Sequence, residues 1–312
     1  MVLEVEHLRV AFRTEKGLSV PVRDVSFSIP ENGRVALVGE SGCGKSLTAL
    51  TVGGLVDRAE IEGRISRPSR IAYVFQNPMQ SLNPVMRVGK QVEEGLEGRS
   101  KVACLLSLVG LPSGTEKKYP CELSGGQQQR VMIAMALAQE PDLLIADEPT
   151  TALDVTTQSE VLDLIGRIAD ERKMAVLLIT HNLGLVARYS KFVNVMYAGR
   201  IVETGTIDEI YYEPAHPYTW GLLSAMPDLD TDDDRLYTIP GSPPNLLHPV
   251  PGDAFAPRNV YALNIDDRAE PPMFKLSDTH YAATWLLDPR APKVEMPPEL
   301  KARIQRMKKE AK

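Results

Sequence analysis

One short segment, Gly39–Ser46, constrains this chain more than any other part of its sequence. It reads GESGCGKS and fits the pattern G-x-x-x-x-G-K-[ST]. It follows the apolar run Arg34–Val38 and leads into the helical pattern of Ser46–Leu55, so we expect a strand, a glycine-rich loop and a helix in succession. Backbone N–H groups of such a loop, together with the helix N-terminus, bind phosphate oxygens. The sequence therefore predicts a phosphate site on an α/β fold.

Strand and helix patterns alternate along much of the chain. We expect strands at Leu3–Val10, Pro21–Ile29, Leu143–Ala146 and Ala175–Ile179, helices at Gln129–Ala138 and Gln158–Asp170, and a hairpin at Phe192–Thr204. Residues from about 85 to 122 indicate helices broken at Gly110-Leu111-Pro112. Alternating strands and helices predict a mostly parallel sheet covered on both faces.

The chain of 312 residues suits one large domain with an appendage. We expect a main domain at 1–227, containing a helical subdomain at about 85–138. An acidic and then proline-rich stretch predicts a linker and a small irregular module at 228–292. The tail, 293–312, is interpreted as a solvated charged helix; the alternative is contact with anionic lipid headgroups or a membrane protein.

Composition narrows the possible classes of protein. The three cysteines have no paired metal spacing and cannot all pair, so we expect neither a zinc site nor a disulfide framework. The net charge of −6 argues against a general nucleic-acid binder. We find no signal-peptide pattern and no apolar run of membrane-spanning length, so the chain is not expected to span a membrane and could sit on one by docking to a partner.

Two acids follow the apolar run of Leu143–Ala146. Asp147 and Glu148 are expected at the end of a buried strand, near the glycine-rich loop. Lys45 should reach the β- and γ-phosphates of a nucleotide, and the Ser46 hydroxyl should ligate Mg²⁺. Asp147 should hold the same ion through water or through Ser46, and Glu148 should activate an attacking water as general base.

A second glycine-rich segment, LSGGQ at Leu123–Gln127, precedes a helical pattern. Ser124 is a good N-cap, and Gly125 and Gly126 expose backbone N–H groups at a helix start. With this segment, the chain resembles the ABC ATPase family, whose signature motif it matches. The resemblance implies that this surface faces the γ-phosphate held by the phosphate loop of another chain.

Four further matches to the family imply roles for single residues. Phe12 falls where the family has an aromatic residue stacked on adenine; the alternative is a core strand residue. Gln76 matches a glutamine that senses Mg²⁺ and contacts membrane subunits, and Thr151–Asp154 (TALD) matches a loop that crosses the dimer interface. His181 matches a histidine that touches the γ-phosphate.

The expected site therefore combines residues from the whole main domain. The expected catalytic residues are Glu148, His181 and Gln76, and the expected metal ligands are Ser46, Gln76 and Asp147. The expected nucleotide contacts are Phe12, Gly39, Ser41, Gly42, Cys43, Gly44, Lys45, Ser46, Leu47, Ser124, Gly125, Gly126 and Gln127. Cys43 is interpreted as a small filler of the loop and not as a nucleophile.

Longer matches narrow the resemblance to the oligopeptide, dipeptide and nickel branch of ABC importers. They lie at Gln76–Val85, Arg130–Thr156 and Pro214–Pro227. This resemblance implies ATP hydrolysis with Mg²⁺ at the cytoplasmic face of a membrane, driving import of oligopeptides or dipeptides. Import of nickel or oligosaccharide, and a non-transport ABC ATPase, remain alternatives. The resemblance to this branch also implies three kinds of partner: a second ATPase subunit, commonly in a heterodimer, two permease subunits and an extracellular binding protein.

The sequence departs from this branch in two ways. Many members have four cysteines near the C-terminus that resemble iron–sulfur ligands, and Asp253, Asn259, Asp266 and Thr284 occupy the matching positions here. None is a thiolate, so no cluster is expected, and two carboxylates alone are a poor cation site. The segments between Leu55 and Ile71 and before Leu123 are also short for the family.

Overall fold

The computed structural model describes residues 1–15, 17–96, 101–151, 153–226, 237–248 and 250–310. Its strands form one large twisted sheet in the order β4-β1-β2-β9-β8-β3-β7-β6-β5. The strand bounds are β1 Leu3–Thr14, β2 Gly17–Ile29, β3 Arg34–Val38, β4 Glu60–Ser66, β5 Ile71–Val74, β6 Leu143–Asp147, β7 Ala175–Thr180, β8 Phe192–Tyr197, β9 Arg200–Thr206, β10 Phe274–Lys275 and β11 Tyr281–Ala282.

The centre of this sheet is parallel, as predicted. Strands β5, β6, β7, β3 and β8 pair parallel to their neighbours, and β9 returns antiparallel to β8 as the expected hairpin. All five residues of β6 and all six of β7 are buried. Continuous apolar runs suit such strands because helices cover both faces of a parallel sheet. The carboxyl ends of β3 and β6 therefore lie on the same edge, where parallel strands place a ligand site.

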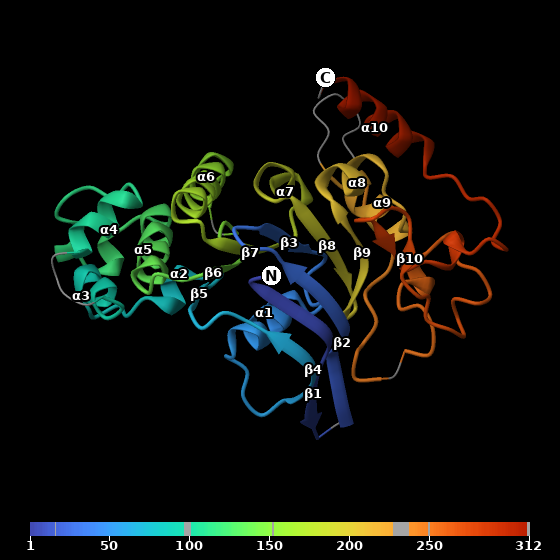
Figure 1. The fold of residues 1–312 in the computed structure, drawn as a ribbon, viewed down its shortest axis with the longest axis horizontal. Coiled ribbons are helices and arrows are strands. Elements are labelled where there is room, and N and C mark those ends of the chain that lie inside the picture. The colour runs from blue at the N-terminus through green and yellow to red at the C-terminus, as the bar shows by residue number, and fades with distance from the viewer. Residues whose placement is uncertain (16, 97–100, 152, 227–236, 249, 311–312) are drawn as a thin grey trace.

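Helices pack on the sheet, and several of them form a separate group beyond one of its ends. Their bounds are α1 Lys45–Gly53, α2 Pro78–Ser81, α3 Val88–Glu93, α4 Val102–Leu108, α5 Gly125–Ala138, α6 Val155–Arg172, α7 Leu183–Tyr189, α8 Ile207–Tyr212, α9 Pro217–Ser224 and α10 Pro298–Glu310. Helices α3, α4 and α5 gather at one end of the molecule, and the C-terminal segments lie at the other (Figure 1). The helical subdomain expected at about 85–138 is present, with short 3-10 turns at Thr115–Lys117 and Pro120–Glu122.

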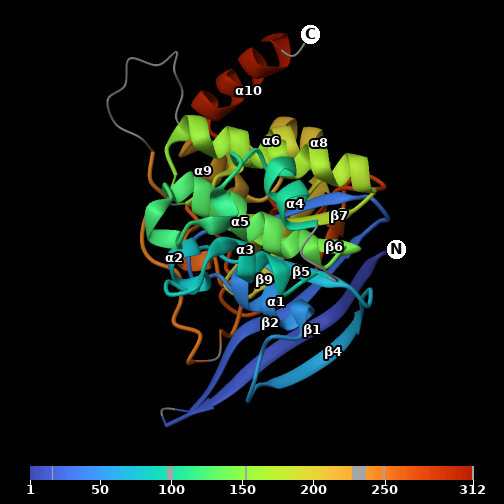
Figure 2. The ribbon, with the colours of Figure 1, turned by 90° about the vertical axis from the view of Figure 1, so that its left-hand side faces the viewer.

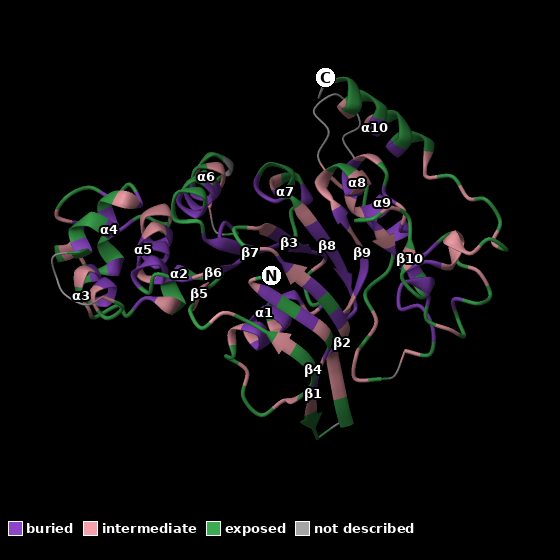
Figure 3. Cartoon of the chain, in the orientation of Figure 1, coloured by how far each residue is buried: buried purple, intermediate pink, exposed green. Residues whose placement is uncertain are grey.

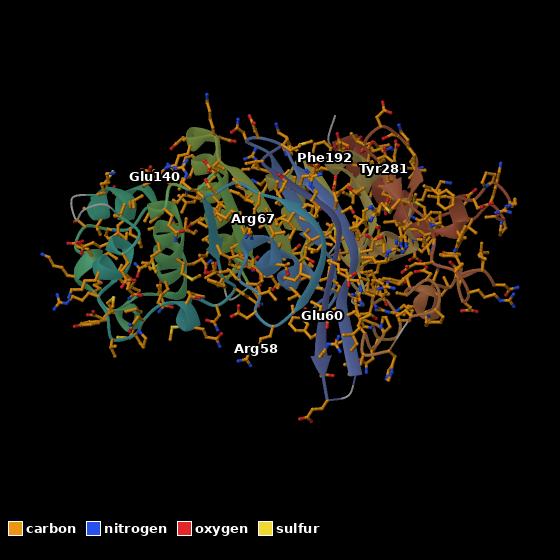
Figure 4. The ribbon with its side chains drawn as sticks, turned by 60° about the horizontal axis from the view of Figure 1, so that its bottom comes forward. Arg58, Glu60, Arg67, Glu140, Phe192 and Tyr281 are labelled. Atoms are coloured by element: carbon orange, nitrogen blue, oxygen red, sulfur yellow. The ribbon has the colours of Figure 1, made fainter. Side chains whose placement is uncertain are left out.

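The N-terminal strands form an antiparallel layer beside the core. Strand β1 pairs with β2 on one side and β4 on the other, and the three strands twist away from the helices in the side view (Figure 2). Strands β4 and β5 were not among the sequence-based predictions. Figure 4 labels Glu60 at the start of β4, where its carboxylate accepts a hydrogen bond from Arg13 of β1.

The buried residues form three clusters that follow the layers (Figure 3). One lies between the helical subdomain, α6 and the sheet, and a second lies between α1, the sheet and the N-terminal strands. The third joins β8, β9, α7, α8 and α9 to the C-terminal segments. The second cluster contains Cys43, so the glycine-rich loop packs against the sheet and the N-terminal strands.

The C-terminal module, defined here as residues 250–292, is less separate than the sequence suggested. Its strand β11 pairs antiparallel with β9, so it extends the central sheet, and β10 pairs with β11. Strand β9 lies between β8, which begins at Phe192, and β11, which contains Tyr281 (Figure 4). The acidic stretch with which the predicted linker begins lies outside the described residues. The module therefore packs directly on the main domain.

The tail is a helix, but it is not merely solvated. In α10, Leu300 and Ile304 are buried in the third cluster. Arg303 donates hydrogen bonds to the carbonyl oxygens of Leu223 in α9 and of Met226 just beyond that helix. Its apolar face is therefore docked, while its basic residues remain at the surface. In the part of the chain that the structure describes, no helix is both long and apolar enough to cross a bilayer.

Candidate active site

The glycine-rich loop lies between the end of β3 and the start of α1. A Cβ on Gly39 would approach the carbonyl oxygen of Met196 to 2.1 Å, and its φ of +153° is also rare for other residues. Lys45 is buried, and its ammonium donates to the carbonyl oxygens of Gly39 at 2.8 Å and Glu40 at 2.9 Å. The loop therefore wraps around the cation that is expected to bind phosphate.

Cys43 is enclosed within this loop. Burial raises the pKa of its thiol, although the nearby Lys45 ammonium acts in the opposite direction. The raised pKa keeps this thiol neutral, whereas a reactive cysteine requires an accessible thiolate. This geometry agrees with the interpretation of Cys43 as a filler of the loop.

Ser46 and Asp147 meet as predicted. The Ser46 hydroxyl donates to Asp147 Oδ1 at 3.0 Å, which joins the start of α1 to the end of β6. The Tyr73 hydroxyl of β5 donates to the other carboxylate oxygen at 2.8 Å. Burial raises the pKa of Asp147, against the effect of these two hydrogen bonds. Tyr73 was not predicted; its only signal was its place on the strand before Gln76.

Glu148 is the centre of a second network. Its carboxylate accepts hydrogen bonds from Gln76 Nε2 at 2.9 Å and from the Thr151 hydroxyl at 2.8 Å, and it lies 3.2 Å from His181 Nδ1. Burial disfavours its charge, but the hydrogen bonds from Thr151 and His181 outweigh this and lower its pKa. Its φ of +44° is uncommon outside glycine and typical of functional sites, and its N–H donates to the Ile179 carbonyl. The structure thus brings together all three predicted catalytic residues.

The signature segment forms a different surface. Ser124 caps α5 through a capping box with Gln127, in which each side chain accepts from the other residue's N–H, at 3.3 and 3.1 Å. Such a cap stabilises a helix by about 1 kcal/mol. An open groove of about 470 Å³ is lined by Ser124–Gln127, Arg130, Leu153, Asp154 and Thr157, among others, and by no residue of Gly39–Ser46. Within the described residues, the two glycine-rich segments therefore do not line one common groove.

Two predicted residues lie at the margins of these surfaces. Asp154 is the N-cap of α6 and accepts from the N–H and the hydroxyl of Thr157, so part of the TALD loop lines the signature groove. Phe12 lies near the end of β1 and is partly buried against the second core cluster. Adenine stacking on Phe12 stays a prediction.

The four positions matched to family cysteines are buried in the C-terminal module and close local turns. Their side chains accept hydrogen bonds from nearby backbone N–H groups, with the acceptors being Asp253, Asn259, Asp266 and Thr284. Burial raises the pKa of Asp253 to about 6. Among the described residues, no group of three or more histidine, cysteine, aspartate and glutamate side chains is placed to hold a metal. The expectation that no iron–sulfur cluster is present stays a prediction.

Comparison with known proteins identifies the family. A model described as "ABC transporter" matches residues 22–151, and one described as "Oligopeptide/dipeptide transporter, C-terminal region" matches residues 202–265. The chain is 46% identical to the oligopeptide transport ATP-binding protein OppD of Bacillus subtilis, over 98% of this chain and 94% of OppD. This chain belongs to the ATP-binding subunits of ABC transporters.

Other relatives agree with this assignment. The dipeptide transport ATP-binding protein DppD of Lactococcus lactis is also 46% identical, over 98% of this chain and 96% of that protein. Among solved structures, CbiO1 of Clostridium perfringens, part of an ABC transporter complex, matches 68% of this chain and 91% of its own with a TM-score of 0.59 and 27% identity. The dimeric bacterial ABC transporter cassette MJ0796 matches with a TM-score of 0.58 and 26% identity, over 66% of this chain and 98% of its own. The predicted fold class and the ATPase assignment are confirmed.

Proposed function

We propose that Gly39–Ser46 holds the phosphates of ATP and that Glu148 activates the water that attacks the γ-phosphate. The observation that carries this proposal is the convergence of Gln76, Thr151 and His181 on the Glu148 carboxylate, one residue after Asp147. An ionised, oriented carboxylate can take a proton from a water molecule while the oxygen of that water attacks the γ-phosphorus. The bond between the γ-phosphorus and the bridging oxygen breaks, and ADP leaves with that oxygen. Within this site, Lys45 neutralises phosphate charge.

The side chains near the phosphate loop fit a magnesium ion. The Ser46 hydroxyl and the Asp147 carboxylate lie together, and Gln76 is tied to the adjacent Glu148. Mg²⁺ is usually held by one or two carboxylates with substrate phosphates and water, so this oxygen set suffices. When bound, the ion would neutralise charge on the β- and γ-phosphates. Tyr73 would orient Asp147 through its hydrogen bond.

We propose that a complete ATP site forms between two chains. The signature groove lies apart from the phosphate loop, and its capped helix start presents N–H groups suited to a γ-phosphate. The related cassette MJ0796 is described as a dimer, which supports this arrangement. The branch resemblance favours a heterodimer with a second ATPase subunit. Two permeases and an extracellular binding protein complete the proposed complex, which places this chain at the cytoplasmic face of the membrane.

The cargo we propose is an oligopeptide or dipeptide. The support is the match of residues 202–265 to the peptide-transporter C-terminal region and the names of OppD and DppD. The test is reconstitution of this chain with its sister ATPase, permeases and binding protein in vesicles. Peptide, added with binding protein, should stimulate ATP hydrolysis and enter the vesicles. Stimulation by nickel or an oligosaccharide, with none by peptides, would contradict the peptide assignment.

A further inference from the structure

An arginine of the C-terminal module reaches into the phosphate loop. Arg258 donates from Nη1 to Glu40 Oε2 at 2.6 Å and from Nη2 to Glu40 Oε1 at 3.0 Å. Its side chain is only 4% exposed, and the carboxylate of Glu40 is 28% exposed. Such a bidentate pair fixes the orientation of both groups, unlike a surface ion pair. Glu40 is the second residue of the glycine-rich motif, and the two residues are 218 positions apart in sequence.

The guanidinium is itself held in place. Its Nε donates to the Pro240 carbonyl at 2.7 Å, Nη2 donates to the Ile239 carbonyl at 3.2 Å, and Nη1 donates to the Tyr197 hydroxyl at 3.3 Å. Arg258 therefore uses all three nitrogens and has little freedom to follow Glu40 if the loop moves. The pair joins the loop to a fixed part of the module.

A second contact fixes the backbone of Glu40. Its N–H donates to the hydroxyl of Tyr218 at 2.8 Å. Tyr218 is fully buried on α9, where its ring packs against those of Tyr197 and Phe255, with centroids 4.7 and 5.4 Å away. Phe255 belongs to the C-terminal module. Both the peptide group and the carboxylate of Glu40 are thus set by residues outside the motif.

This arrangement bears on the phosphate-binding cation. The Glu40 carbonyl accepts from Lys45, so a shift of Glu40 moves a group that positions the ammonium. An unpaired carboxylate in this loop would also repel a triphosphate, since like charges raise the free energy of binding. Arg258 offsets this repulsion and holds the Glu40 carboxylate in one orientation.

We propose that Arg258 is a positioning residue for ATP, through which the C-terminal module controls the affinity of the phosphate loop. This inference rests on the proposed assignment of Gly39–Ser46 as the ATP site. The inference predicts that neutralising Glu40 raises the affinity for ATP in a chain that lacks Arg258. If Arg258 acts by neutralising and orienting Glu40, then removing the charge of Glu40 should repair much of the damage caused by losing Arg258. A residue that only stabilises the fold would not show this repair.

The experiment measures the dissociation constant of a fluorescent ATP analogue with Mg²⁺ on the full chain. The variants are Arg258→Met, Arg258→Lys, Glu40→Gln and the double variant Glu40→Gln/Arg258→Met. We expect Arg258→Met to raise the constant about 5-fold or more, the range typical of coupled neighbouring groups. The double variant should recover most of that loss. Arg258→Lys should have a dissociation constant between those of the wild type and Arg258→Met, because lysine keeps the positive charge but cannot form two parallel hydrogen bonds to the Glu40 carboxylate.

A control variant tests whether any ion pair between the module and the main domain has this effect. Glu270 of the same module pairs with Arg23 at 2.7 Å and Arg200 at 3.0 Å on the central sheet, without touching the phosphate loop. Glu270→Gln should leave the dissociation constant unchanged. Thermal melting of every variant identifies those that fail to fold. If Arg258→Met does not fold, the dissociation constant of Arg258→Lys is used in its place.

Three results separate the possible failures. Wild-type affinity in folded Arg258→Met, or in folded Arg258→Lys if Arg258→Met does not fold, would overturn the inference. Equal losses in Arg258→Met and the double variant would also overturn it. If Lys45→Ala too retained full affinity, the ATP site itself would be wrongly assigned, which distinguishes failure of the proposed function from failure of this inference.

Discussion

At the scale of single residues, the two acids after β6 have different surroundings. Asp147 is buried and bonded to the hydroxyls of Ser46 and Tyr73, whereas Glu148 is bonded to Gln76 and Thr151 and lies beside His181. Burial raises the pKa of the first, and hydrogen bonding lowers that of the second. The first environment suits a metal ligand, and the second suits an ionised base.

Glu148→Gln should therefore retain ATP binding and lose hydrolysis by about 100-fold or more, the usual contribution of a general base. The measurement is phosphate release by the assembled transporter, with ATP binding measured in parallel. Glu62→Gln is the control, because Glu62 lies on the exposed strand β4, where it pairs with Arg9 of β1. Near wild-type turnover in Glu148→Gln would show that another group is the base.

Tyr73→Phe tests a residue that the sequence did not reveal. It removes one hydrogen bond from Asp147 and keeps the ring that packs 4.5 Å from that of Phe75. The Mg²⁺ concentration for half-maximal ATPase activity should rise about 10-fold, as for other residues that orient metal ligands. An unchanged Mg²⁺ requirement would remove Tyr73 from the site.

At the scale of elements, prediction from sequence succeeded where patterns are local. The strand, loop and helix around Gly39–Ser46 follow from an apolar run, glycines and a helical pattern. Strand β4 was missed because its residues are mostly polar and exposed, so they carry no alternating signal. The pairing of β11 with β9 was missed for another reason: β11 has two residues, and its partner lies far along the chain.

The docking of α10 was also hidden, because basic residues dominate its sequence. Ile304→Ala should destabilise this helix by about 2–4 kcal/mol, the cost of truncating a buried aliphatic side chain. Hydrogen exchange of the α10 amides should rise accordingly. Lys301→Ala is the control, since Lys301 is exposed and forms a surface pair with Glu295. Equal exchange in the two variants would argue against docking.

At the scale of the whole molecule, one buried histidine of the main domain lies beside the C-terminal module, with its ring centroid 5.8 Å from that of Phe255. His216 caps α9 by accepting from the Tyr218 N–H at 3.0 Å, and its own N–H donates to the buried Glu203. Burial lowers the pKa of His216 to about 3, against about 6.5 in an unfolded chain. The folded state therefore resists protonation more strongly than the unfolded state.

The sign of the pH dependence follows from this shift. The unfolded chain takes up the proton first, so this contribution is complete above pH 6.5 and is lost as pH falls toward 3. The free energy of unfolding should fall more steeply between pH 6.5 and 5 in the wild type than in His216→Asn, which keeps a cap acceptor and does not titrate. Denaturant unfolding measures both slopes, and equal slopes would contradict the assignment.

The Arg258–Glu40 pair also belongs to this scale, because no local pattern could have predicted a contact between the phosphate loop and the C-terminal module. Family resemblance indicated which residues share the ATP site, but the support given by Tyr73, Tyr218 and Arg258 depends on tertiary packing. The same packing leaves the signature groove outside the phosphate loop. This separation is what the proposed dimer requires, in which each chain would supply one half of each of two ATP sites.

The rate of ATP hydrolysis per chain, measured as the sister ATPase and permeases are titrated in, tests the composite site most directly. The isolated chain at low concentration should bind ATP and turn over slowly, and the rate should rise toward a plateau as partners complete the site with a second signature segment. A rate that is already full for the lone chain, and independent of its concentration, would contradict the composite site.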